Sequence, residues 1–298
     1  MIPEYGGNVH NLAGYERRVS INLSDIRDRF SLQALLANQE VIFNLAGQTS
    51  HLDSMHDPQT DLEINGMAQL SLLQLCQRVN PDARIVFAST RQIYGRPRYL
   101  PVDEDHPINP VDINGINKLS AELYHRLYHQ VYGLSTCVLR LTNTIGPRMR
   151  ILDARQTFLG VWIRRRLDRQ PIEVWGGDQL RDFNDVEDVV DALLLAGAEA
   201  SLPPDPYNLD SSETISLREL AELMIDLNGA GELEIRSFPE ERRKIDLDDY
   251  YSSCSRFLRA TGWKFRHTLR QTVGRTLGWG GSEMPGEWGC PAVPSRRR

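Results

Sequence analysis

The chain has 298 residues, of which 41% are hydrophobic and 25% are charged, and its formal net charge is −6. This length is enough for one large domain or two closely joined ones, and the composition is ordinary for a soluble globular protein. The negative net charge argues against a general nucleic-acid-binding surface. No apolar run reaches the length of a membrane span, and the first residues do not have the pattern of a signal peptide.

The cysteines give no sign of metal or redox chemistry. None of the four is paired at C-x-x-C spacing, so we predict neither a zinc site nor a redox motif, and no metal. Cys76 and Cys137 lie inside apolar runs and are expected to be buried. Unpaired, buried cysteines fit a reducing compartment, and the predicted location is therefore the cytoplasm, with no membrane partner.

Short apolar runs alternate with longer helical patterns in the first half of the chain. The runs are rich in β-branched residues and bounded by polar segments, which is typical of buried parallel strands. Strands that alternate with helices predict an α/β fold with a parallel sheet and right-handed crossovers. The predicted strands are residues 19–23, 41–45, 84–88 and 136–141.

Two helices are predicted between these strands, at residues 61–78 and 114–131. Most apolar residues of the first helix are expected to face the sheet, and those of the second form one stripe at spacings of three and four. In the first helix they are Leu62, Met67, Leu70, Leu73 and Leu75, and in the second Ile116, Leu119, Leu123, Leu127 and Val131.

The pattern changes after about residue 146, where prolines and glycines become frequent. One clear helix follows, because Ser216 and Glu219 form a capping box ahead of an apolar face. The final residues, 279–298, combine glycine, proline and a terminal arginine run without periodicity, which indicates a flexible tail.

These patterns predict two domains. Residues 1–146, with 183–211 returning to them, would form a Rossmann-like doubly wound parallel sheet. Residues 147–182 and 212–278 would form a smaller α/β substrate-binding domain.

Polar or small residues follow three of the predicted strands, at Gly47-Gln48, Ser89-Thr90 and Thr142-Asn143. Ligands of open parallel sheets bind at the carboxyl ends of the strands, so these positions predict the site. A hydroxyl loop at a strand end, followed by a helix that carries Lys118, is the arrangement of a sugar-oxidising dehydrogenase site.

The ordered motifs resemble those of the extended short-chain dehydrogenases/reductases, in particular NAD-dependent nucleotide-sugar epimerases and dehydratases such as UDP-glucose 4-epimerase. Members of that family remove a hydride from a sugar carbon onto NAD and usually return it. The resemblance covers most of the chain. The motifs are Asp25-Ile26-Arg27-Asp28, residues 43–48, Asn65-Gly66, residues 89–95, residues 118–122, residues 140–148, Arg181-Asp182-Phe183, residues 243–246 and Gly262-Trp263.

The resemblance implies roles for single residues. Thr90 would hydrogen-bond the reacting oxygen, and Lys118 would bind the nicotinamide ribose and lower the pKa of a neighbouring tyrosine. Taken alone, Thr90 could instead cap a strand end, and Lys118 could lie on a helix surface. The cofactor-binding residues would be Asp25, Ile26, Leu45, Ala46, Gly47, Gln48, Asn65, Ser89 and Lys118.

On the substrate side, Asn143, Arg181 and Arg243 would hold the diphosphate of a nucleotide sugar, because guanidinium forks match phosphate. Arg91 and Gln92 follow Thr90, where the family's dehydratases carry an acid pair or a Glu. Neither can exchange a proton at neutral pH, which disfavours dehydration and leaves epimerisation or simple redox.

Asn114 departs from the family pattern, because the proton-accepting tyrosine is expected four residues before Lys118. An amide can position groups but cannot accept the proton. Loss of a positioned base typically costs about 10²–10⁴ in rate. Three residues are candidate replacements, namely Tyr94, Asp112 and His125.

The second departure is the lack of a G-x-x-G-x-x-G turn in the sequence. In the family this turn precedes the helix whose N-terminus holds the pyrophosphate. A shortened gene model or fragment and a natural loss of NAD binding both explain its absence. We expect an N-terminally truncated sheet with weak or absent NAD binding.

The leading hypothesis is an NAD-dependent epimerase that acts on a nucleotide-diphosphate sugar. The alternatives are a nucleotide-sugar oxidoreductase or dehydratase, and a catalytically impaired protein that still binds sugar nucleotides. The resemblance also implies a possible homodimer through the helices at 61–78 and 114–131.

Overall fold

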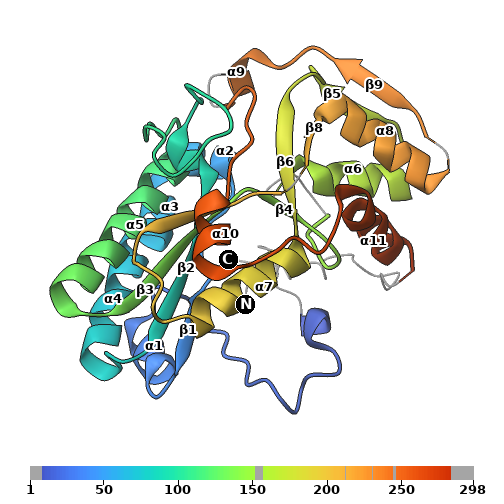
Figure 1. Cartoon of the computed structure of the whole chain (residues 1–298). Coiled ribbons are helices and arrows are strands. Elements are labelled where there is room, and N and C mark those ends of the chain that lie inside the picture. The colour runs from blue at the N-terminus through green and yellow to red at the C-terminus, as the bar shows by residue number, and fades with distance from the viewer. Residues whose placement is uncertain (1–8, 152–156, 212, 230, 244–245, 283–298) are drawn as a thin grey trace, which may run out of the picture.

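The core of the molecule is a parallel sheet with the order β1-β2-β3-β7 (Figure 1). The computed structural model describes residues 9–151, 157–211, 213–229, 231–243 and 246–282. Every pair of neighbouring strands in this sheet is parallel, which confirms the predicted parallel α/β fold. The strands are β1 (Val41–Asn44), β2 (Arg84–Thr90), β3 (Ser135–Leu141) and β7 (Pro206–Leu209).

Helices cover both faces of this sheet (Figure 1). On one face, α1 (Arg29–Leu36), α4 (Ala68–Val79) and α5 (Ile113–Tyr132) pack around Ile85. On the other, α7 (Val186–Ala198) and α10 (Ser255–Thr261) pack around Val86. Adjacent residues of β2 therefore face opposite layers, as the pleat of a strand requires.

Residues 19–23 were predicted to be a strand and are not one. They form an extended segment in which Val19, Ile21 and Leu23 are all exposed. Among the described residues, nothing pairs with the edge of β1 that faces away from β2. An apolar alternating segment becomes a strand only when a neighbouring strand offers it backbone hydrogen bonds, and no such neighbour is present for this segment.

The helix predicted at residues 61–78 has a wider turn within it. It runs from α3 (Pro58–Leu62) through the π-helical turn η3 (Glu63–Met67) into α4. Leu73 and Leu75 are buried as predicted, whereas Leu62 and Met67 are exposed. π-turns inside α-helices often mark functional sites, and this one carries Asn65.

Helix α5 has its polar side toward the sheet. Its buried residues include Asn117, Lys118, Glu122 and His125. The predicted apolar stripe instead faces outward, and Ile116, Leu123, Leu127 and Val131 are each about half exposed. The spacing predicted the helix correctly, but the side that faces the sheet depends on the polar groups that it meets there.

A second layered unit lies beside the sheet (Figure 1). Its strands form two small groups, β4-β6-β8 and β5-β9, and its core contains Trp162, Phe183 and Met224. The capping box is confirmed, because Ser216 and Glu219 bond each other's backbone amides at the start of α8. The elements are β4 (Asn143–Ile145), α6 (Phe158–Leu167), β5 (Ile172–Trp175), β6 (Leu180–Asp185), β8 (Thr214–Ser216), α8 (Leu217–Asn228), β9 (Leu233–Arg236) and α11 (Leu269–Ser282).

The predicted tail begins too early, because α11 continues through residue 282; the rest of it, 283–298, lies outside the described residues. The domain boundaries remain a prediction. The remaining short helices are η2 (Val9–Leu12), α2 (His51–His56), η4 (Arg91–Tyr94) and α9 (Glu240–Arg243).

Cys76 and Cys137 are buried free thiols, as predicted. Across the part of the chain that the structure describes, no helix is both long and apolar enough to cross a membrane.

Candidate active site

The centre of the candidate site is a buried carboxylate, Asp61, that binds three asparagine side chains. Its Oδ2 accepts from Asn65 Nδ2 at 3.0 Å and from Asn114 Nδ2 at 3.1 Å. Its Oδ1 accepts from Asn117 Nδ2 at 2.8 Å. A carboxylate only accepts hydrogen bonds, so it fixes the orientation of all three amides with nitrogen toward Asp61 and oxygen away from it.

Asn114 is held firmly at the position where the family has its tyrosine. Its Nδ2 also donates to the Gln48 carbonyl at 2.7 Å, and Asn65 Nδ2 donates to the same oxygen at 3.0 Å. The side chain therefore joins α5 to the loop that follows β1. Asn114 has a structural role here and leaves only its Oδ1 as an acceptor for a ligand.

Lys118 lies one helical turn beyond Asn114, and its amine lies over the ring of Phe87 and donates to the Ala88 carbonyl at 3.1 Å. Burial lowers the pKa of Lys118 to about 8, although the nearby carboxylates of Asp61 and Glu122 act in the opposite direction. A Cβ on Gly47 would lie 2.8 Å from Lys118 Nζ and 2.9 Å from Asn65 Oδ1. A larger residue at position 47 would therefore displace the Lys118 amine and the Asn65 side chain from these positions.

Thr90 and Ser89 end β2 in different environments. Thr90 Oγ1 accepts from the Gln92 amide at 3.2 Å, which caps η4 and leaves the hydroxyl proton free for a ligand. Ser89 donates to the buried Glu122, which forms an ion pair with Arg140 at 2.7 Å. Ser89 is therefore bonded to a buried ion pair, whereas the Thr90 hydroxyl proton has no partner among the described residues.

Each of the three candidate replacements for the missing base already has its own hydrogen bonds or ring contact within the fold. Tyr94 donates to Asn208 at 2.7 Å and accepts from Arg140 at 2.7 Å, and burial raises its pKa. Asp112 caps α5 by accepting from the Gly115 amide at 2.6 Å. His125 is stacked on Phe87, and burial lowers its pKa to about 4.

The predicted cofactor residues occupy two separate places. Gly47 and Gln48 line a cavity of about 1140 Å³ between the loop after β1, the start of α7 and α11. Leu45 and Ala46, just before them, are exposed. Asp25 lies on the loop before α1, where its carboxylate binds Arg27 and its pKa is lowered by that contact, and Ile26 packs against the cluster around α4.

The cofactor-facing groups fit the nicotinamide ribose end of a dinucleotide. Asn65 Oδ1 and Gln48 Oε1 are buried acceptors without a partner among the described residues, and both lie beside or on the Gly47 loop. Lys118 uses one of its three donors on Ala88. These atoms can bind ribose hydroxyls, whereas the sequence offers no glycine-rich turn for the pyrophosphate.

The predicted substrate residues converge only in part. Asn143 Oδ1 accepts from Arg91 Nη2 at 3.2 Å, which links it to the Thr90 loop. Arg181 is buried and forms an ion pair with Asp246 at 3.1 Å. Arg243 is exposed and lines a separate cavity of about 620 Å³, together with Asp246. The two arginines thus share a neighbour, although Arg181 is not free for phosphate in this arrangement.

Two further buried acids are neighbours of each other, and one of them, Asp182, is also near Arg91. Asp182 accepts at Oδ2 from the Ser252 hydroxyl at 2.9 Å, and its Oδ1 has no partner among the described residues. Burial raises the pKa of Asp182, and Arg91 opposes this rise. Burial also raises the pKa of Asp210 to about 7, so this acid is partly protonated at neutral pH.

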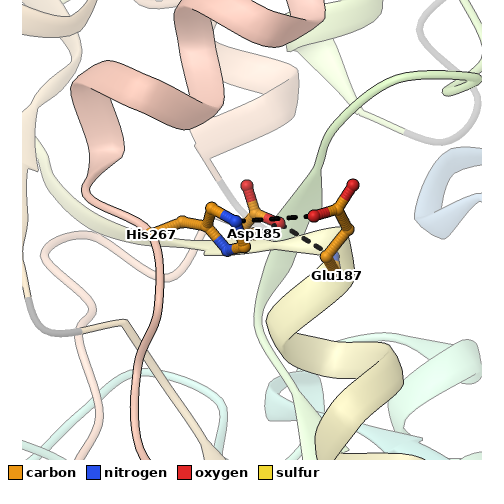
Figure 2. A group of neighbouring side chains, drawn as sticks. All are labelled: Asp185, Glu187 and His267. Atoms are coloured by element: carbon orange, nitrogen blue, oxygen red, sulfur yellow. Dashed lines mark hydrogen bonds and ion pairs between the residues drawn. The ribbon is translucent and has the colours of Figure 1, made fainter.

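Figure 2 shows a group that the sequence did not suggest, formed by Asp185, Glu187 and His267. Their ligand atoms lie within 4.8 Å of one another, a spacing that a metal ion could use. Arg275 forms ion pairs with both carboxylates, 2.7 Å from that of Glu187. We interpret the group as an ion-pair cluster that joins α7 to α11.

Sequence reasoning missed Asp61 and the position of Arg91. Asp61 lies four residues before Asn65 and so on the same helix face, which is the sequence signal for their contact. Arg91 was considered only for the acid that it replaces. Its contact with Asn143 joins segments far apart in sequence, and no local pattern reports such a contact.

Comparison with known proteins agrees with this geometry. Residues 5–210 match the model of the NAD dependent epimerase/dehydratase family. GDP-6-deoxy-D-mannose reductase of Pseudomonas aeruginosa is 31% identical over 245 residues, which cover 78% of each protein. UDP-glucuronic acid decarboxylase 1 of Xenopus tropicalis is 31% identical over 251 residues, 80% of this chain and 56% of that protein.

The fold is similar to that of solved relatives. The crystal structure of UDP-glucose 4-epimerase from Thermotoga maritima with UDP-glucose superposes with a TM-score of 0.83 at 25% identity, over 92% of this chain and 87% of that one. Membership of one family explains the parallel sheet, the hydroxyl loop after β2 and the lysine on α5. The chain belongs to the NAD-dependent epimerase/dehydratase family of nucleotide-sugar enzymes.

Proposed function

We propose that the protein is an NAD-dependent epimerase that acts on a nucleotide-diphosphate sugar. The observation that carries the proposal is the position of Lys118, whose amine binds the carbonyl of Ala88, two residues before Thr90 in β2. The same amine and Asn65 Oδ1 lie beside Gly47, and Asn65 and Asn114 share the Gln48 carbonyl. Among its relatives, the solved UDP-glucose 4-epimerase binds UDP-glucose. Arg91 and Gln92 after Thr90 provide no acid for dehydration.

NAD, when bound, would accept the hydride from a sugar carbon and return it. Lys118 would hold the ribose hydroxyls, with Asn65 Oδ1 as a nearby acceptor. The Thr90 hydroxyl would donate a hydrogen bond to the reacting sugar oxygen, and Asn114 Oδ1 would accept one from a neighbouring hydroxyl. These groups orient the sugar, but Asn114 cannot accept the proton that leaves during oxidation. That proton would pass to solvent water, at a cost of about 10²–10⁴ in rate relative to a positioned base.

We also propose that NAD binding by this chain is weak. The described residues serve the ribose end of the cofactor, and the sequence has no glycine-rich turn for the pyrophosphate. Titration of the full chain with NADH, followed by nicotinamide fluorescence, should give a weak and salt-sensitive signal. Stoichiometric NAD in the purified protein would contradict this part of the proposal.

The test of the epimerase proposal is incubation of the full chain with NAD and a panel of UDP-, dTDP-, GDP- and CDP-sugars. Products are separated by stereochemistry. We expect interconversion of two stereoisomers of one sugar, and its loss in Lys118→Met. A product oxidised or dehydrated at the end of the reaction would support the oxidoreductase or dehydratase alternative instead.

A second candidate is a sugar-nucleotide-binding protein with impaired catalysis, and the fixed position of Asn114 favours it. Binding of a panel sugar without conversion would identify this case. Asn114→Tyr then gives a sharper measurement, because it supplies the phenol that the family uses beside Lys118. Gain of turnover in this variant, with none in the unchanged chain, would show that only the base is missing.

We further propose a homodimer through α4 and α5. Helix α5 presents a stripe of half-exposed apolar residues while its polar side is buried, and exposed Met67 lies at the start of the neighbouring α4. Large exposed apolar patches usually mark interfaces. Light scattering after size exclusion should give twice the chain mass, reduced to one chain mass by Leu123→Glu with Leu127→Glu. Ile108→Glu, at an exposed apolar residue outside these helices, is the control.

A further inference from the structure

Arg91 lies directly after Thr90, and among the described residues no carboxylate forms an ion pair with its guanidinium. It follows Thr90 in the chain, and its guanidinium stacks over the Tyr250 ring with 5.1 Å to the centroid. Nη2 donates to Asn143 Oδ1 at 3.2 Å. Nη1 is buried and has no hydrogen-bond partner among the described residues. A buried, unused guanidinium donor is costly unless a ligand completes it.

The neighbouring charged residues do not supply a partner for the free Nη1 donor of Arg91. Arg181 is paired with Asp246 at 3.1 Å, so that pair is neutral as a unit. Asp182 directs Oδ2 to the Ser252 amide and hydroxyl at 3.0 and 2.9 Å. Within the described part of the chain, Arg91 forms no ion pair with any carboxylate. Asp182 therefore attenuates the local positive charge without occupying the guanidinium.

The position of Arg91 determines which part of a substrate it meets. Thr90, the preceding residue, has the hydroxyl proposed for the reacting sugar oxygen, and Asn143 binds the Arg91 guanidinium. The guanidinium is thus close to the sugar ring. A planar fork with a free N–H is best completed by a planar anion, which on a sugar is a carboxylate.

We propose that Arg91 is a specificity-determining residue that selects nucleotide sugars whose hexose carries a carboxylate, that is, nucleotide-linked uronic acids. This inference rests on the proposed function at the same site and deepens it. Tyr250 holds the guanidinium plane, and Asn143 fixes its rotation. Arg91 thereby orients the sugar against Thr90 rather than taking part in proton transfer.

The experiment is a calorimetric titration of the full chain with matched pairs, UDP-glucuronate against UDP-glucose and GDP-mannuronate against GDP-mannose. In at least one pair the uronate should bind about 10- to 100-fold more tightly, the range expected of a charge-assisted hydrogen bond. Arg91→Gln should abolish the preference, so that this variant binds the uronate and the neutral sugar of each pair with equal affinity. Arg91→Lys keeps the charge without the fork and should retain a reduced preference.

The control is Arg98→Gln, an exposed arginine beyond η4, which should keep the full preference. Thermal melts show whether each variant is folded, and Arg91→Lys carries the test if the glutamine variant is not. An equal affinity for uronate and neutral sugar in the unchanged chain overturns this inference and leaves the proposed function standing. An undiminished preference in folded Arg91→Gln overturns it too. Failure of every sugar nucleotide to bind overturns both.

Discussion

The buried acid Asp61 and the buried pair Asp182 and Asp210 differ in how many of their carboxyl oxygens are hydrogen-bonded. Under Lys118, Asp61 has both oxygens occupied, by the amides of Asn65, Asn114 and Asn117. Asp182, near Arg91, and its neighbour Asp210 each keep one oxygen without a partner among the described residues. The Asp61 carboxylate is thus fully hydrogen-bonded, whereas the carboxyl groups of Asp182 and Asp210 retain hydrogen-bonding capacity.

The difference indicates where a ligand can stabilise the protein. A saturated buried carboxylate stabilises the fold and fixes its neighbours, whereas an unsaturated one is costly until something binds it. Asp61 therefore fixes Asn65, Asn114 and Asn117 before any ligand binds. The Arg91 side is the part of the site that a substrate would complete.

The largest effect is expected from removal of the Asp61 carboxylate. Asp61→Ala leaves three buried amides without their shared acceptor and should lower the free energy of unfolding by about 4 kcal/mol. Urea denaturation at pH 7 measures this loss. Asp53→Ala, at a half-buried acid on α2, is the control, and similar losses in both variants would show that Asp61 is not the centre of the group.

Lys118→Met should raise stability by about 3 kcal/mol at neutral pH while it removes cofactor binding. Burial lowers the pKa of Lys118 from 10.5 to about 8, so the folded chain binds fewer protons than the unfolded chain between these values. Stability should therefore rise with pH through this window. The free-energy cost of burying the charged Lys118 amine is fully present below pH 8. Melting curves from pH 7 to 9.5 test this, with exposed Lys264→Met as control.

Asp210→Asn should stabilise the protein by about 2 kcal/mol at pH 8, after allowance for relaxation of the site. Burial raises the pKa of Asp210 from 3.8 to about 7, so the folded chain holds a proton that the unfolded chain releases. The stability that the protonated Asp210 contributes is fully present below pH 3.8 and is lost as the pH rises to 7. The gain should thus be small at pH 4 and complete at pH 8, and a gain independent of pH would refute the assignment.

Ser252→Ala gives the smallest expected change, a loss of about 1 kcal/mol, because Asp182 keeps its bond from the residue 252 amide. Chemical denaturation with Ser253→Ala as the neighbouring control measures it. A loss as large as that of Asp61→Ala would mean that the two acid groups are equally saturated, against the comparison made above.

The sequence predicted the parallel sheet because β-branched apolar runs and helical spacing are local properties, and β1, β2 and β3 lie where these patterns place them. It also predicted the capping box of α8. It was wrong for residues 19–23, since a strand also needs a partner strand, and that partner is not a local property.

For the site, the sequence by itself determined the residue types at the strand ends and the asparagine in place of tyrosine. Only the tertiary structure decided what holds them: Asp61 binds amides from two helices, and Arg91 meets Asn143 across 52 positions of sequence. The orientation of α5, with polar groups inward and the apolar stripe outward, was decided there too. The physical reason is that spacing fixes which residues share a helix face, whereas the partners that the fold brings to that face determine its burial.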